Sequence, residues 1–283
     1  MALPRILGLA AMVLAAATPA TAQARYGADP AAGHTFVHDG VRLYYEVYGT
    51  GEPLLLVHGN GGSIADWRAQ IDDFRKRYRV IAMDGRSQGR SGDGKAPLTY
   101  EQMSDDLAAL LEHLRVGPAY VLGWSDGGIE ALLLGIRHPS KVKKIASMAA
   151  NISPADSSLY PEVTALVRSG LDAAPAGSRE HELTRLVLEQ PHIDPKSLAS
   201  ITAPTLIMAG DHDVIRDEHT LEIFHRLPGA QLAVFPDATH MLPYDDPARF
   251  NAVVERFFRT PFVRRDRVKD VLESLAKLRA AGD

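Results

Sequence analysis

Short apolar runs alternate with helical patterns along most of the chain, and this alternation limits the folds that the sequence can adopt. The runs cover residues 53–57, 79–83, 119–122, 144–148, 204–208 and 230–235. Continuous apolar runs of this length are typical of strands buried on both faces of a parallel sheet. Because parallel strands need crossover connections, we expect the intervening helices to cover both faces of a single sheet.

Two local patterns add detail to this architecture. Val41, Leu43, Tyr45 and Val47 alternate with polar residues, which predicts a hairpin-like pair of strands at the start of residues 35–57. Thr99 is followed three residues later by a glutamine, so it is expected to cap a helix whose apolar face is well marked. The residues of that face are Met103, Leu107, Leu110, Leu111 and Leu114.

Residues 151–200 interrupt the alternation because they contain only helical fragments, such as 162–168 and 180–189. We interpret them as a small helical cap inserted into a domain that spans residues 25–260, with ordinary connecting helices as the alternative. Residues 261–283 form a charged extension with five apolar residues at helical spacing, and we expect a solvated helix that lies on the domain.

The N-terminus has the features of a cleaved secretory signal. Arg5 precedes an apolar run at residues 6–17, and small residues follow around Ala22 and Ala24. The run is too short to cross a bilayer, so we expect a signal peptide over residues 1–22, with cleavage after 22 or 24, rather than a stable membrane anchor. The mature protein is then expected to be periplasmic or secreted.

The composition excludes several chemistries. The chain has 283 residues and contains no cysteine, so disulfides, thiolate nucleophiles and cysteine-bound metals are excluded. Lys and Arg total 31 against 35 for Asp and Glu, without a basic run, which argues against nucleic acid as a partner. We expect a small-molecule substrate and neither a metal nor another cofactor, while the oligomeric state is left open.

The string Gly123-Trp124-Ser125-Asp126-Gly127-Gly128 follows one apolar run directly and precedes a helical stretch. A G-x-S-x-G sequence between strand and helix is typical of a nucleophile elbow, in which a sharp turn exposes the serine. Ser125 is therefore the candidate nucleophile. Trp124 and Asp126 flank it and are candidates for substrate binding.

A serine hydroxyl needs a general base and a carboxylate that orients this base. Downstream of the nucleophile, both types of residue follow predicted strands: Asp211 and Asp213 come after residues 204–208, and His240 comes after 230–235. His240 is the candidate base, and spacing alone does not choose between the two aspartates. A developing oxyanion needs backbone donors, and we expect the N–H groups of Asn60 and Asp126 to supply them.

These motifs together resemble the α/β-hydrolase superfamily, from about residue 35 to residue 258. The matching strings are HGNGG (58–62), GWSDGG (123–128), PTLIMAGDHD (204–213) and ATHMLPYDDP (238–247). They are most similar to serine hydrolases related to valacyclovir hydrolase and the biphenyl-hydrolase-like group. The resemblance implies an α/β fold with a mostly parallel eight-stranded sheet, and it implies Asp213 as the acid. Ser87 and Gln88 depart from the family pattern, which often has Gly and His there.

The sequence thus predicts a serine hydrolase that cleaves an ester, lactone or activated amide of a small molecule through an acyl-enzyme. A cofactor-free perhydrolase and an aminopeptidase-like hydrolase are alternatives with the same triad. A non-catalytic ligand-binding protein with the same fold is a third. Asp126 has two interpretations: its carboxylate either stabilises the helix N-terminus or attracts an ammonium group on the substrate.

Overall fold

A computed structural model describes residues 25–280 of the chain. The predicted signal peptide at residues 1–22 lies outside the described residues, so export and cleavage stay predictions. Among the described residues, none of the helices is both long enough and apolar enough to cross a membrane.

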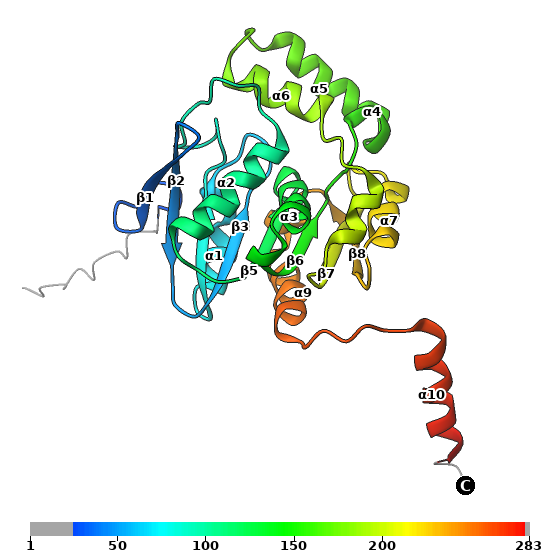
Figure 1. Ribbon diagram of the computed structural model, residues 1–283. Coiled ribbons are helices and arrows are strands. Elements are labelled where there is room, and N and C mark those ends of the chain that lie inside the picture. The colour runs from blue at the N-terminus through cyan, green and yellow to red at the C-terminus, as the bar shows by residue number, and fades with distance from the viewer. Residues whose placement is uncertain (1–24, 281–283) are drawn as a thin grey trace, which may run out of the picture.

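Eight strands form one sheet in the order β1-β2-β4-β3-β5-β6-β7-β8 (Figure 1). The strands are β1 (Gly33–His38), β2 (Val41–Tyr48), β3 (Glu52–Val57), β4 (Tyr78–Met83), β5 (Ala119–Trp124), β6 (Val142–Met148), β7 (Thr205–His212) and β8 (Gln231–Thr239). β2 pairs antiparallel with both β1 and β4, and the remaining pairs are parallel. The predicted strands, the hairpin and the mostly parallel sheet are confirmed.

Helices cover both faces of the sheet. They are α1 (Arg68–Phe74), α2 (Tyr100–His113), α3 (Asp126–Arg137), α4 (Ala155–Ser158), α5 (Pro161–Ala173), α6 (Arg179–Glu189), α7 (Asp217–Arg226), α8 (Leu242–Asp245), α9 (Pro247–Arg259) and α10 (Arg267–Ala280). One core cluster packs α2, α3 and α7 on one face, and a second packs α1 and α9 on the other. Within β3, Leu55 belongs to the first cluster while Leu54 and Leu56 belong to the second, as the period of two in a strand requires. The amide of Gln102 donates to the Thr99 hydroxyl at 3.2 Å, which confirms the predicted cap of α2.

The parallel strands end at one edge of the sheet, and the loops after β3, β4, β5, β7 and β8 meet there. The stretch 151–200 contributes α4, α5, α6 and a short 3-10 helix (Pro195–Ser200) between β6 and β7. Figure 1 shows α5 and α6 side by side beyond this edge. Two core contacts hold α6 to the body: Leu183 and Leu186 are buried in the cluster that contains α2 and α3.

The C-terminal helix corrects one expectation. α10 forms at the predicted place, but Figure 1 shows it standing apart from the sheet and its covering helices. Its five apolar residues are 47–71% exposed, so the prediction that this helix lies on the domain is wrong. Helical periodicity reports that a helix has an apolar face, and it does not report whether that face is covered within the chain.

Two substitutions, one of a phenylalanine in the core and one of a leucine in the extension, test this division. Phe250 on α9 is fully buried, so Phe250→Ala should lower the free energy of unfolding by about 3–5 kcal/mol. Leu278 on α10 is 71% exposed, so Leu278→Ala should change it by less than about 0.5 kcal/mol. Urea unfolding followed by circular dichroism measures both, and a large loss for Leu278→Ala would contradict the exposed position of α10.

Candidate active site

Ser125 lies on a strained turn between β5 and α3, with φ +58° and ψ −122°. A residue with a side chain rarely adopts a positive φ, and such backbone strain concentrates at functional sites. Close packing enforces the turn: a Cβ on Gly123 would collide with the carbonyl of Gly127, and a Cβ on Gly127 would collide with the carbonyl of Val57. The glycines of the G-x-S-x-G string are therefore required by backbone contact on both sides of the serine.

The Ser125 hydroxyl faces His240, with 3.0 Å between Oγ and Nε2. The other ring nitrogen of His240, Nδ1, is 2.7 Å from Oδ1 of Asp213. A carboxylate only accepts, so this bond assigns the proton to Nδ1 and leaves Nε2 free to accept the serine proton. The Asp213 side chain is fully buried, and the amide of Ile215 also donates to its Oδ1 at 3.2 Å. The three residues thus form a connected chain of hydrogen bonds.

Asp211, the competing acid, points elsewhere. Its Oδ1 accepts from the amide of Ala238 at 3.1 Å and lies 2.8 Å from Nδ1 of the exposed His212. These hydrogen bonds, that of His212 first, lower the pKa of Asp211 to about 2. The structure therefore brings Asp213 to His240, whereas Asp211 ties the end of β7 to the end of β8.

Trp124 holds the backbone of His240 in place. Its indole Nε1 donates to the backbone carbonyl of His240 at 2.8 Å, and its ring lies 5.6 Å from the His240 ring and 5.4 Å from the Tyr244 ring, centroid to centroid. The side chain is 8% exposed. The substrate contact predicted for Trp124 has no support in this geometry, which instead gives the residue a role in holding the His240 loop.

The loop of residues 58–62 follows β3 and passes next to the nucleophile. A Cβ placed on Gly59 would lie 3.2 Å from the Cβ of Ser125. This approach brings the backbone that carries the Asn60 N–H to the same place as the N-terminus of α3, which begins at Asp126. The dipole of α3 favours negative charge at this place. The N–H groups of Asn60 and Asp126, which are the predicted oxyanion donors, belong to the two segments that meet there.

A second loop, residues 84–91, fixes the first. The amide of Gly85 donates to Nε2 of His58 at 2.9 Å, and the amide of Gly61 donates to Oε1 of Gln88 at 2.7 Å. Gln88 is one of the two departures from the family pattern, and it supplies a hydrogen bond to the neighbouring loop. Ser87, the other departure, has φ +61°, a conformation that a glycine adopts without strain.

The side chain of Asn60 forms contacts that the sequence did not reveal. Its Nδ2 donates to Oδ2 of Asp126 at 2.9 Å and to the carbonyl of Leu183 on α6 at 3.1 Å. One amide group thus joins the loop after β3, the first turn of α3 and the cap. Leu183 is 123 residues away in the chain, so no spacing or motif could have indicated this connection.

Asp126 belongs to a buried acidic cluster. Its side chain is 5% exposed, and burial raises its pKa, while hydrogen bonds from Asn60 and Tyr100 act in the opposite direction. Glu130, one turn later on α3, is 3% exposed, and burial followed by the nearby charges of Asp126 and Asp106 raises its pKa well above the ordinary value. The Asp126 carboxyl is thus enclosed and bonded to Asn60 rather than displayed on an open surface.

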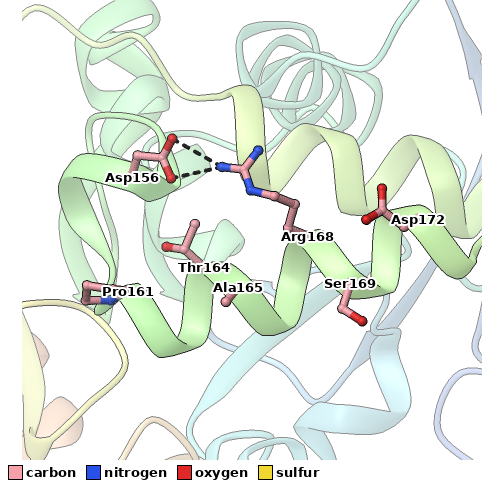
Figure 2. A pocket seen from close by; sticks show the side chains of 7 residues that line it. All are labelled: Asp156, Pro161, Thr164, Ala165, Arg168, Ser169 and Asp172. Atoms are coloured by element: carbon pink, nitrogen blue, oxygen red, sulfur yellow. Dashed lines mark hydrogen bonds and ion pairs between the residues drawn. The ribbon is translucent and has the colours of Figure 1, made fainter.

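An open hollow lies on the cap, along α4 and α5 (Figure 2). It measures about 430 Å³ and is lined by Asp156, Pro161, Thr164, Ala165, Arg168, Ser169 and Asp172. Arg168 donates to both carboxylate oxygens of Asp156, at 3.0 and 3.2 Å, and both side chains are exposed. Since Ser125 and His240 are not among the lining residues, the hollow is separate from the triad. Within residues 25–280 there is also no cluster of three or more His, Asp or Glu suited to a metal ion.

Comparisons with known proteins agree with this fold. The family model described as "alpha/beta hydrolase fold" matches residues 52–168. The serine hydrolase BPHL of Mus musculus is 29% identical over 245 residues, which cover 78% of this chain and 84% of BPHL. RutD of Azorhizobium caulinodans is 37% identical over 111 residues, which cover 39% of this chain and only 42% of RutD. The enol-lactonase of Burkholderia xenovorans has the same fold, with a TM-score of 0.71 at 19% identity over 80% of this chain and all of that one.

The acidic cluster predicts a pH dependence of stability. The pKa of Glu130 in the folded protein is raised above the ordinary value of 4.5, so the unfolded chain releases this proton at a lower pH than the folded protein does. The free energy of unfolding therefore falls as the pH rises from 4.5 toward the raised pKa. Glu130→Gln removes this term, so the stability of the variant relative to the wild type should increase with pH, by up to about 1.4 kcal/mol per unit. Urea unfolding between about pH 5 and 8 measures it, and parallel pH profiles of the two proteins would refute it.

Proposed function

We propose that this chain, which has the α/β-hydrolase fold, is a serine hydrolase that cleaves an ester, lactone or activated amide of a small molecule through an acyl-enzyme. The observation that carries this proposal is the chain of hydrogen bonds from Ser125 through His240 to Asp213. BPHL is named a serine hydrolase, and the Burkholderia xenovorans neighbour is named an enol-lactonase. Both names support acyl transfer to water.

The proposed reaction begins with proton transfer from the Ser125 hydroxyl to Nε2 of His240. Oγ attacks the substrate carbonyl carbon, and the carbonyl oxygen becomes an oxyanion that accepts from the backbone N–H groups of Asn60 and Asp126. When the tetrahedral intermediate collapses, the bond to the leaving group breaks, and His240 gives its proton to that group. Ser125 is left as an ester of the substrate acyl group.

The second half of the cycle uses water in place of the serine. His240 takes a proton from the water, whose oxygen attacks the acyl carbon, and collapse returns the proton to the Ser125 oxygen and releases the carboxylic acid. Asp213 accepts from Nδ1 throughout, which keeps the imidazole oriented and stabilises its protonated form. The two halves balance in atoms and charge, with water as the only co-reactant.

Substitution of the nucleophile and base tests this proposal. Ser125→Ala and His240→Ala should each lower kcat by about 10⁴-fold or more on a p-nitrophenyl ester, and the double variant should be barely worse because the residues act as a unit. A fluorophosphonate probe should label the wild type and not Ser125→Ala. His212→Ala is the control, since His212 is exposed and contacts Asp211. Undiminished hydrolysis in Ser125→Ala would exclude the mechanism, and a lack of labelling in the wild type would favour a ligand-binding protein.

The identity of the acid is tested separately. Asp213→Asn leaves the shape of the site unchanged but removes the negative charge and can place an amide N–H donor against Nδ1, which favours the wrong tautomer of His240, so kcat should fall by about 10³–10⁴-fold. Asp211→Asn should lower kcat by less than about fivefold, because the residue contacts Ala238 and His212 and not His240. Steady-state kinetics on one ester measure both variants. The reverse ranking would transfer the role to Asp211.

A further inference from the structure

α10 presents an apolar face that no other part of the described chain covers. Its apolar residues lie within a stripe about 120° wide when the helix is drawn at about 100° per residue. These residues, with their exposed fractions, are Val268 (68%), Val271 (56%), Leu272 (60%), Leu275 (47%) and Leu278 (71%). An isolated helix of 14 residues is only marginally stable in water, so this face needs a surface to pack against.

The charge of the extension is opposite to that of the body. Residues 261–280 contain six Lys or Arg and three Asp or Glu, a net charge of +3, whereas residues 25–260 contain 24 and 31, a net charge of −7. On the helix, Arg279 lies within the C-terminal end of the apolar stripe, whereas Lys269 lies outside the stripe and 3.9 Å from Glu273, and Lys277 shares the far side with Asp270 and Glu273. The charge that favours an anionic partner is therefore the net +3 of the extension, with Arg264 and Arg265 before the helix and Arg279 at its end.

We propose that α10 binds reversibly to the surface of a membrane that contains anionic lipid. An amphipathic helix of this kind lies in the interface with its apolar face among the acyl chains and its cations near the headgroups. Residues 261–266 join it to α9 without helix or strand, so the acidic body can remain in water while the helix is bound.

A second copy of the chain fits this face less well. The apolar spacing covers only two heptads, whereas a stable helix pair usually needs three or four. In a symmetric parallel pair, Arg279 within the stripe would also face its own copy and repel it. An anionic lipid surface instead attracts them, and it accommodates a helix of this length.

Sedimentation of the full chain with vesicles tests the proposal. The wild type should bind vesicles of phosphatidylcholine with about 30 mol% phosphatidylglycerol at least about tenfold more strongly than vesicles of phosphatidylcholine alone, and raising NaCl from about 0.05 to 0.5 M should reduce the difference. The double substitution Leu272→Glu/Leu275→Glu should lower binding to the anionic vesicles by at least about tenfold. Arg264→Ala/Arg265→Ala keeps the apolar face, so it should lower binding to the anionic vesicles and leave binding to the neutral vesicles unchanged.

The control is Val37→Glu/Leu166→Glu, which adds the same two charges at residues that are 69% and 73% exposed on β1 and α5. This variant should bind as the wild type does. Equal binding by the α10 variants and the wild type would overturn the proposal, as would equal binding to neutral and anionic vesicles. A concentration-dependent dimer in light scattering that Leu272→Glu/Leu275→Glu abolishes would assign the face to a second copy and overturn it as well.

Discussion

The close backbone contact among β3, β5 and α3 determines the rest of the candidate site. Gly123 and Gly127 allow β5 and the first turn of α3 to approach each other and the end of β3 so closely that Ser125 is forced into a positive φ. This strain, of order 1–3 kcal/mol, is compensated by the fully buried parallel strands on either side. The same contact brings the loop after β3 to the N-terminus of α3, so the turn that exposes the hydroxyl also gathers the backbone donors beside it.

Around this turn, the remaining parts are held by hydrogen bonds from groups that take no direct part in the proposed reaction. Trp124 fixes the backbone of His240, and Gln88 and His58 fix the loop that follows β3. Asn60 extends the arrangement to the cap through Leu183. Acyl transfer requires the reacting groups on these separate loops to be placed within about 0.5 Å of their productive positions. These hydrogen bonds hold the loops in place. The Asn60 amide is thus one of the links between the cap and the site.

The sequence was sufficient for the architecture because each buried strand is a continuous apolar run and each covering helix has a period near 3.6. It also indicated Ser125 and His240, since each follows a strand that ends at the same edge. Spacing alone left Asp211 and Asp213 undecided because both lie on one loop, and the choice of Asp213 came only from the family resemblance. The role of the Asn60 side chain and the isolation of α10 were inaccessible, since one depends on a contact 123 residues away and the other on the absence of a cover.

In the proposed reaction, a negative charge on Asp126 would repel the oxyanion that forms next to Ser125. Two like charges about 5 Å apart repel by about 3 kcal/mol at an effective dielectric constant of about 20, so an ionised Asp126 would oppose the reaction. Burial raises the pKa of Asp126 and so favours its neutral form, although the hydrogen bonds from Asn60 and Tyr100 act in the opposite direction. The Asn60 amide occupies Oδ2 of this carboxyl. A substrate ammonium would have to compete with Asn60 for this enclosed carboxyl. For the proposed hydrolase, we therefore expect a preference for uncharged esters and lactones over α-amino esters.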